Sequence, residues 1–338
     1  MNIKRIAAAG VVGIAAASVA LATVAAPASA ATNIKVGTVG LNAIGTVPWA
    51  QASGIFAKNG INVTEIKLYP APPPTLAALA AGAVDIAYAP SIAIINAYAN
   101  AGMALKVIAP ADGYPPGAVS KAKKSLVEAA KLDDTAVCVS PTSGIKSWKD
   151  LAGKTVSVPA RGTQGEVSIA QAVKNDGGNP AAVNYVTLPF GAMLDTLKSG
   201  KTQAAFLVTP FTADCTAQGL KLIGYPGIQF FDNEVAVGMW VTTAKFAADN
   251  PAAVLGWQKS IAQVNRFGGT KTGWDKILQA ANPAYTDIDL ATARKSNPSY
   301  LPATIVAYDL KGPAAKMLDL GFLKKPVDVA GLLVKQYR

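Results

Sequence analysis

The sequence contains no histidine, and this absence excludes several kinds of function. Without imidazole the chain cannot form a Ser-His-Asp or Cys-His catalytic group, a histidine general base or a histidine zinc ligand. It also lacks a Gly-x-Ser-x-Gly nucleophile motif, a Walker phosphate loop and a Gly-x-Gly-x-x-Gly dinucleotide motif. Enzymes built on carboxylates or lysine stay compatible with the composition, but no acidic pair stands out. We therefore expect a protein that is not an enzyme and that needs no metal or cofactor.

Long apolar runs are scarce as well, and only the N-terminus carries one. Lys4 and Arg5 precede an apolar stretch over residues 6–26, and Ala28-Ser29-Ala30 then matches the small-residue pattern that signal peptidase cleaves. The pattern predicts a Sec signal peptide over residues 1–30, cleaved after Ala30, with an uncleaved anchor helix as the alternative. No cysteine lies near the cleavage site, so no lipid anchor is expected. The mature protein should be periplasmic or secreted.

Cysteine is also rare, since only Cys138 and Cys215 are present. An exported protein meets an oxidising compartment, so this even pair predicts a disulfide. On the chain-entropy model a loop of this length stabilises the fold by roughly 4 kcal/mol. The alternative is two buried free thiols, and two thiolates alone cannot supply a structural zinc site.

The formal net charge of the chain is +11, because 31 basic residues outnumber 20 acidic ones. The basic residues are scattered, apart from Lys121, Lys123 and Lys124 and the pair Lys324 and Lys325. We interpret them as a solvated surface, with a positive field that attracts anionic solutes as the alternative. An exported protein rarely meets nucleic acid, so no nucleic-acid partner is expected.

One pattern occurs twice in the chain. Its first copy is Leu76, Leu79, Gly82, Asp85 and Ala87, and its second is Leu194, Leu197, Gly200, Gln203 and Ala205. In each copy, leucines three apart lead to a glycine and then to a short apolar run. This pattern predicts a helix that ends at a C′ glycine and feeds a buried strand. Two related α/β lobes with a cleft between them are therefore expected.

Strand and helix signals alternate along most of the chain, which favours mainly parallel sheets flanked by helices. A Gly/Pro cluster at residues 113–117 predicts the first connection between the lobes. Residues 230–241 predict a return crossing, and later helices are expected to pack on the first lobe. Lobe 1 is expected to comprise residues 31–112 and 234–338, and lobe 2 residues 113–233.

Five segments resemble the SsuA/THI5-like substrate-binding proteins of ABC transporters, the sulfonate, taurine and nitrate group. They are Gly54-Ile55-Phe56-Ala57-Lys58-Asn59-Gly60-Ile61-Asn62-Val63, the two Leu-x-x-Leu-x-x-Gly segments, Trp148-Lys149-Asp150-Leu151-Ala152-Gly153-Lys154 and Leu318-Asp319-Leu320-Gly321-Phe322-Leu323. The resemblance covers nearly the whole mature chain. It implies a type II periplasmic-binding-protein fold with two α/β lobes and two crossing segments, which closes around a small ligand for a membrane permease.

The resemblance also indicates ligand-facing loops in the first lobe. Trp49 is expected on the first-lobe wall, with a place in the core as the alternative. Thr75 begins a helix whose free amides could meet an anion, or it only caps that helix. Ser91 repeats this geometry after the third strand, again as a cap or a ligand donor.

In the second lobe, the loop at residues 161–165 is the favoured binding segment. Arg161 offers a planar guanidinium suited to carboxylate or sulfonate, Gly162 lets the backbone approach, and Thr163 and Gln164 add polar groups. A surface position is the alternative for Arg161. Phe190 and Phe211 are expected to stack on the body of the ligand or to lie in the core.

Thr209 stands before Pro210 where relatives often carry an acidic residue, which argues against a cationic ligand. The sequence therefore predicts a monomeric solute-binding component of an ABC importer, with a small organic anion as ligand and permease subunits as partners. A secreted enzyme without histidine and a sensory binding protein are the alternatives.

Overall fold

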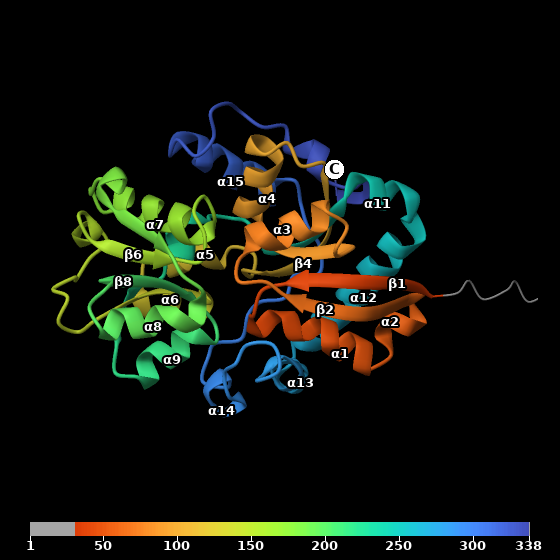
Figure 1. Cartoon of the computed structure of the whole chain (residues 1–338), viewed down its shortest axis with the longest axis horizontal. Helices are drawn as coiled ribbons and strands as arrows, with labels where there is room; N and C mark the ends of the chain where they lie inside the picture. Colours follow the sequence, from red (N-terminus) through yellow and green to blue (C-terminus); the bar gives the residue numbers. More distant parts are fainter. Residues whose placement is uncertain (1–30, 338) are drawn as a thin grey trace, which may run out of the picture. The chain divides into compact units, whose positions relative to one another are not determined.

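The computed structural model describes residues 31–337, so the expected signal peptide lies outside the described residues. Within this range ten strands form two five-stranded sheets (Figure 1). The first sheet has the order β2-β1-β3-β10-β4, with β1 (Thr32–Thr38), β2 (Ile61–Leu68), β3 (Ile86–Pro90), β4 (Leu105–Gly113) and β10 (Ala236–Thr243). The second has the order β7-β6-β8-β5-β9, with β5 (Thr135–Val139), β6 (Thr155–Val158), β7 (Asn184–Thr187), β8 (Ala204–Val208) and β9 (Lys221–Gly224).

Both sheets have the same strand directions. In the first sheet β10 runs antiparallel to β3 and β4, and in the second β5 runs antiparallel to β8 and β9. The other four strands of each sheet share one direction. The prediction of two mainly parallel sheets is confirmed. We call the first sheet with its helices lobe 1 and the second lobe 2; the residue boundaries given above stay a prediction.

Helices cover both faces of each sheet (Figure 1). In lobe 1 these are α1 (Thr46–Ala52), α2 (Ile55–Lys58), α3 (Pro72–Ala80), α4 (Ser91–Asn100), α11 (Ala244–Asp249), α12 (Pro251–Gly268), α13 (Lys271–Ala281) and α15 (Tyr308–Asp319). In lobe 2 and at the junction these are α5 (Ala118–Ala122), α6 (Leu126–Leu132), α7 (Gln164–Asn175), α8 (Phe190–Lys198), α9 (Phe211–Ala217), α10 (Pro226–Phe230) and α14 (Leu290–Ala293).

The sequence repeat corresponds to an equivalent unit in each lobe. Helix α3 leads to β3 and helix α8 leads to β8, through Gly82 (φ 72°) and Gly200 (φ 71°). Both glycines adopt the left-handed conformation that a C′ residue requires, which other residues rarely adopt. The predicted helix, glycine and strand are therefore confirmed in both copies.

The repeat extends to the polar residue that follows each glycine. Asp85 Oδ2 accepts a hydrogen bond from the amide of Lys35 at 2.7 Å, and Gln203 Oε1 accepts one from the amide of Thr155 at 3.0 Å. Lys35 belongs to β1 and Thr155 to β6, which occupy the same place in their sheets. Each side chain thus ties the start of one strand to its neighbour.

The C-terminal part of the chain packs on lobe 1, as expected. Trp257 of α12 stacks on Phe56 of α2, with ring centroids 5.0 Å apart, and meets Trp240 of β10 edge-on at 5.3 Å. These three side chains are almost completely buried, so they form a large part of the lobe 1 core. The expected crossing at residues 230–241 divides into the end of α10 and the start of β10.

The junction between the lobes is held by Asp133, which is buried at the end of the first connection. Its carboxylate accepts hydrogen bonds from the hydroxyl of Tyr114 at 2.9 Å, the amide of Thr135 at 2.9 Å and the amide of Ile228 at 2.8 Å. Tyr114 lies in the first connection and Ile228 in α10, ahead of the return strand. One side chain therefore joins the two crossing segments.

Candidate functional site

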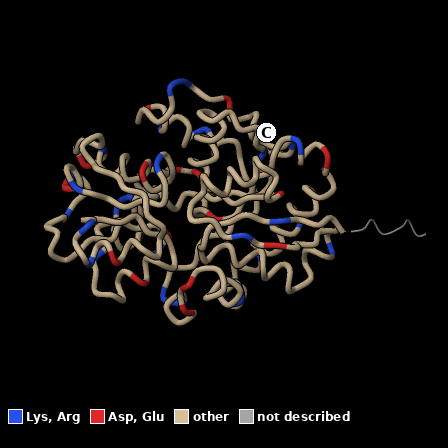
Figure 2. Tube along the Cα trace, in the orientation of Figure 1, with Lys and Arg blue, Asp and Glu red and all other residues tan. Residues whose placement is uncertain are grey.

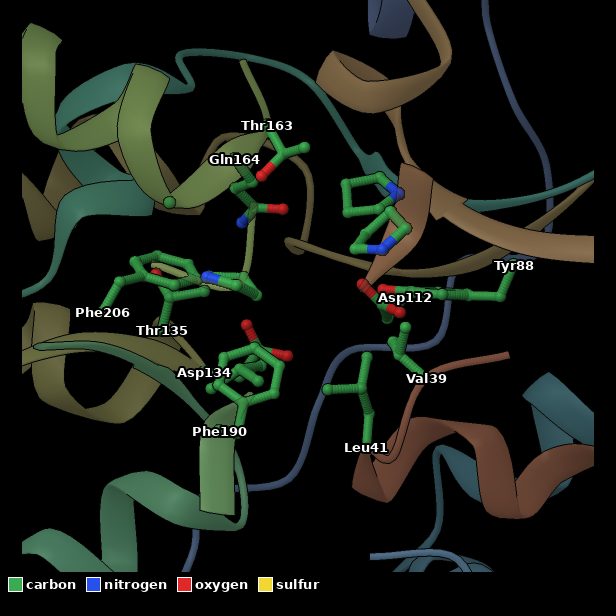
Figure 3. A pocket seen from close by; sticks show the side chains of 15 residues that line it. Val39, Leu41, Tyr88, Asp112, Asp134, Thr135, Thr163, Gln164, Phe190 and Phe206 are labelled. Atoms are coloured by element: carbon green, nitrogen blue, oxygen red, sulfur yellow. The ribbon is translucent and has the colours of Figure 1, made fainter. Parts of the chain in front are cut away.

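A cavity lies between the two sheets and is lined from both lobes (Figure 3). Its volume is about 40 Å³. Lobe 1 contributes Val39, Leu41, Tyr88 and Asp112, and the lobe 2 side contributes Asp134, Thr135, Thr163, Gln164, Phe190 and Phe206.

Strand direction explains why these residues meet. β3 ends at Pro90 where α4 begins, and the loop after β6 leads into α7, so carboxyl ends of strands and N-termini of helices collect around the cavity. Binding sites in open α/β sheets lie outside the carboxyl ends of parallel strands. β5 runs the other way, so Asp134, just before its first residue, reaches the same edge.

Asp112 is the most unusual residue of the site. It lies near the end of β4, only 6% exposed, and its Oδ2 atom has no hydrogen-bond partner among the described residues. It pairs across the ladder with Gly238 of β10. A Cβ atom on Gly238 would lie 2.4 Å from Asp112 Oδ2, so the glycine makes room for the carboxylate. A buried polar atom without a partner is costly, which marks it as a candidate ligand contact.

The environment opposes ionisation of both cavity carboxyls. Burial raises the pKa of Asp112 to about 6, although the hydroxyl of Tyr88 and the amide of Gly238 oppose this shift. Burial also raises the pKa of Asp134 well above its usual range, and the negative charges of Asp112 and Asp133 add to this effect. Neighbouring carboxyls with raised pKa values are a feature of functional sites.

The cavity contains no basic group to balance these acids. None of its lining residues, all within residues 31–337, is lysine or arginine. Figure 2 shows that basic and acidic residues are interspersed along both lobes rather than gathered on one side. The formal charge of the cavity is therefore negative or zero, depending on protonation, although the chain as a whole is basic.

Phe190 and Phe206 form an aromatic wall in lobe 2 (Figure 3). Phe190 stacks on Phe211, with ring centroids 5.3 Å apart and planes 21° apart. Phe211 itself is buried behind Phe190 and does not line the cavity. Of the two expected aromatic residues, the structure brings only Phe190 to the cavity.

The favoured loop reaches the cavity through Thr163 and Gln164, the N-cap and first residue of α7. The hydroxyl of Thr163 donates to the carbonyl of Ala160 at 2.9 Å. Gly162 adopts a left-handed φ of 65°, and its carbonyl accepts a hydrogen bond from Asn96 of α4 at 3.0 Å. Since Asn96 belongs to lobe 1, this bond joins the two lobes beside the cavity.

Arg161 lies outside the cavity. Its Nη2 atom lies 2.6 Å from Glu166 Oε1, and its guanidinium is 5.3 Å from the ring centroid of Tyr185. The side chain is 58% exposed and lines a neighbouring hollow that includes Asn96. Glu166 is the partner that the sequence analysis did not assign to Arg161.

The other expected contacts in lobe 1 also lie off the cavity. Trp49 stacks on Phe267 with ring centroids 5.3 Å apart and planes 13° apart. Thr75 is buried and its hydroxyl donates to the carbonyl of Ala71 at 3.0 Å. Ser91 is buried directly after the lining residue Pro90, and its hydroxyl has no partner among the described residues.

The expected disulfide is confirmed. Cys138 of β5 and Cys215 of α9 are bonded, both are fully buried, and 77 positions separate them in the sequence. The bond attaches the helix that begins with Phe211 to the reversed strand of lobe 2. The described part of the chain contains no other cysteine.

Within residues 31–337, no group of three or more histidine, cysteine, aspartate or glutamate side chains could hold a metal ion. No helix within residues 31–337 is long and apolar enough to span a bilayer.

Solved structures share this fold at low sequence identity. The alkanesulfonate-binding protein SsuA from Xanthomonas axonopodis pv. citri, bound to MOPS, has 16% identity and a TM-score of 0.70, over 91% of this chain and 99% of that one. The periplasmic nitrate-binding protein NrtA from Synechocystis PCC 6803 has 12% identity and a TM-score of 0.71, over 91% of this chain and 87% of that one. These likenesses confirm the two-lobed periplasmic-binding-protein fold.

A third similar structure is the Candida albicans CA3427 gene product, described as having the generic periplasmic binding protein fold. It has 13% identity and a TM-score of 0.70, over 90% of this chain and 96% of that one. No curated protein sequence matches the chain. The family model described as "NMT1/THI5 like" matches residues 44–255, more than half of the chain. This match confirms the resemblance seen in the sequence: the chain belongs to the NMT1/THI5-like family.

Proposed function

We propose that this protein is the exported solute-binding component of an ABC importer. The observation that carries the proposal is a cavity between two lobes, lined by residues of both. The family and the fold support it, since the similar structures include sulfonate-binding and nitrate-binding proteins. The protein would capture a small solute and deliver it as a monomer to permease subunits in the membrane.

Closure of the lobes is the proposed mechanism. A solute that touches both lobes binds the closed form better than the open form, and this difference in affinity shifts the equilibrium. Contacts between the lobes would break on opening. They include the Asn96 to Gly162 hydrogen bond and the ion pair between Lys174 of α7 and Asp319 of α15, whose Nζ and Oδ2 atoms are 2.7 Å apart.

The expected small organic anion is one candidate ligand. It would be held by backbone amides at the N-termini of α4 and α7 and by the polar groups of Thr163 and Gln164. It would also lie beside Asp112 and Asp134, whose negative charges oppose it. The ligand class is considered further below.

Export is part of the same proposal. The leader pattern in residues 1–30 and the disulfide between Cys138 and Cys215 support a place in the periplasm or outside the cell. The chain contains no histidine, which favours binding over catalysis.

The test is a thermal-shift screen of the mature protein against a broad panel of small acids, bases and neutral compounds. A ligand that binds only the folded state raises the melting temperature by mass action. Each hit is then followed by small-angle X-ray scattering, where closure should lower the radius of gyration, and by mass spectrometry to show that the compound leaves unchanged.

A matched pair of variants locates the site. Phe190→Ala should weaken binding of every hit, whereas Leu126→Ala, at a side chain 68% exposed on α6, should not. Conversion of a bound compound into a product would favour an enzyme. A complete lack of hits, or binding that ignores Phe190, would contradict the proposal.

A further inference from the structure

We propose that the solute held in this cavity is a small organic cation, an amine or related nitrogen base with an apolar body, whose N–H groups donate to Asp112 and Asp134. This inference rests on the proposed function and names its ligand class. It differs from the anion expected from the sequence.

The first observation is the unpartnered carboxylate oxygen of Asp112. Its side chain is more than nine-tenths buried and lines the cavity, yet Oδ2 has no hydrogen-bond partner among the described residues. The Tyr88 hydroxyl and the Gly238 amide act on this carboxylate, yet Oδ2 stays without a partner in the described part of the chain. When Asp112 is ionised, this oxygen can only accept, so the missing partner is a donor. Figure 3 shows the Asp112 carboxylate at the lobe 1 side of the open space.

The second observation is the opposing carboxylate. Asp134 lines the lobe 2 side of the same space, and the negative charge of Asp112 acts on it. Apart from backbone groups, the only described donor to the Asp134 carboxylate is the hydroxyl of Ser299, at 3.2 Å. A donor placed between the two acids would contact both lobes, which is what closure requires.

The third observation is the charge of the lining. When ionised, the buried Asp112 and the partly buried Asp134 leave negative charge uncompensated, because no lysine or arginine is among the described lining residues. A cation would supply the balance, whereas an anion would add to the imbalance. The helix N-termini at the cavity carry partial positive charges, but these are smaller than the full charges of ionised acids.

The rest of the lining indicates the body of the ligand. Phe190 and Phe206 from lobe 2 face Val39 and Leu41 from lobe 1 (Figure 3). Apolar walls of this kind bury hydrocarbon or an aromatic ring, and aromatic faces also attract cations. A bare metal ion fits poorly, because two carboxylates and apolar walls cannot complete an oxygen shell.

The test is isothermal titration calorimetry of the mature protein with four probes: benzylamine, butylamine, benzenesulfonate and butanesulfonate. At pH 8 the amines are cationic and the sulfonates anionic, while the carbon skeletons are similar. We expect at least one amine to bind and neither sulfonate to bind. Asp112→Asn and Asp134→Asn should each weaken amine binding by at least about tenfold, since each removes a charged acceptor.

The matched control is Asp195→Asn, which removes a carboxylate from α8 whose side chain is 84% exposed. It should leave amine binding unchanged, and circular dichroism should show that all three variants are folded. A sulfonate that binds more tightly than its amine, amine binding unaffected by Asp112→Asn, or no amine binding at all would each overturn the inference. The proposed function would survive such a result if any solute of the broad panel closes the lobes, and would fall if none does.

Discussion

The guanidinium of Arg161 is the ion-pair partner of Glu166, with Nη2 and Oε1 2.6 Å apart. The Glu166 side chain is only 7% exposed, and its other oxygen accepts a hydrogen bond from the amide of Gly162 at 2.6 Å. Arg161 thus stabilises the loop at residues 161–165 through its ion pair with Glu166, outside the cavity. It does not offer its charge to the cavity.

This arrangement predicts a structural effect for Arg161→Ala. The variant should lower the free energy of unfolding by about 1 kcal/mol, because Glu166 loses a charged partner while solvent screens the exposed arginine. Ligand affinity should change by less than about twofold. Urea unfolding and calorimetry with an identified ligand measure the two quantities.

The control for Arg161 is Lys245→Ala, which removes an ion pair with Asp249 whose lysine side chain is 85% exposed. It should have almost no effect on stability. A large loss of ligand affinity in Arg161→Ala would instead show that Arg161 contacts the ligand.

Asp112→Asn should stabilise the ligand-free protein at neutral pH. Because the pKa of Asp112 is raised from 3.8 to about 6 by burial, the folded protein binds this proton more tightly than the unfolded chain does. The contribution of Asp112 to stability therefore falls as pH rises from about 4 to 6, by at most about 3 kcal/mol. Tyr88, Tyr114 and Asp134 are the titratable groups that interact with it.

Urea unfolding between pH 4 and pH 8 measures this effect. The stability difference between Asp112→Asn and the wild type should grow across the same pH range. Asp195→Asn, an exposed carboxylate, should follow the wild type. A difference that does not vary with pH would show that Asp112 is not held in a raised-pKa state.

Gly238→Ala should displace the Asp112 carboxylate, which lines the cavity. A Cβ at this position would lie 2.4 Å and 2.6 Å from the two carboxylate oxygens of Asp112, closer than such atoms approach. The carboxylate must then move, so ligand affinity should fall by about tenfold or more and stability by about 1 to 3 kcal/mol. Gly191→Ala in α8 meets nothing within 4 Å and should be neutral or slightly stabilising. Equal behaviour of the two variants would contradict the assigned role of Gly238.

Removal of the disulfide should lower stability without abolishing the fold. The double variant Cys138→Ala and Cys215→Ala frees a segment of 77 positions, which costs about 4 kcal/mol on the chain-entropy model. Dithiothreitol should destabilise the wild type by a similar amount and leave the double variant unchanged. The disulfide would be contradicted if dithiothreitol left the stability of the wild type unchanged and both thiols were shown to be free.

The repeat of helix, glycine and strand could be predicted because it depends on local rules. Leucines three apart form one face of a helix, and Gly82 and Gly200 supply the left-handed residue that ends it. The pairing of Cys138 with Cys215 followed from their number and from export. These features need no knowledge of distant contacts.

The acidic character of the cavity could not be predicted in the same way. Asp112 lies near the carboxyl end of a buried strand, which is a usable signal, but Asp134 precedes a strand and reaches the cavity only because β5 is reversed. Arg161 was favoured for its chemistry, and its pairing with Glu166 depends on the geometry of the first turn of α7. The absence of an acid before Pro210 argued against a cation, but Asp112 and Asp134 supply acids from elsewhere.

The disulfide between Cys138 and Cys215 is connected to the cavity wall through helix α9 and one contact between two rings. Helix α9 begins at Phe211, whose ring supports Phe190 from behind. A chain held in a reducing cytoplasm would lack this anchor and present a looser aromatic surface to its solute. Under the proposed function, disulfide formation would precede tight binding, because the bond forms only in the oxidising compartment to which the protein would be exported.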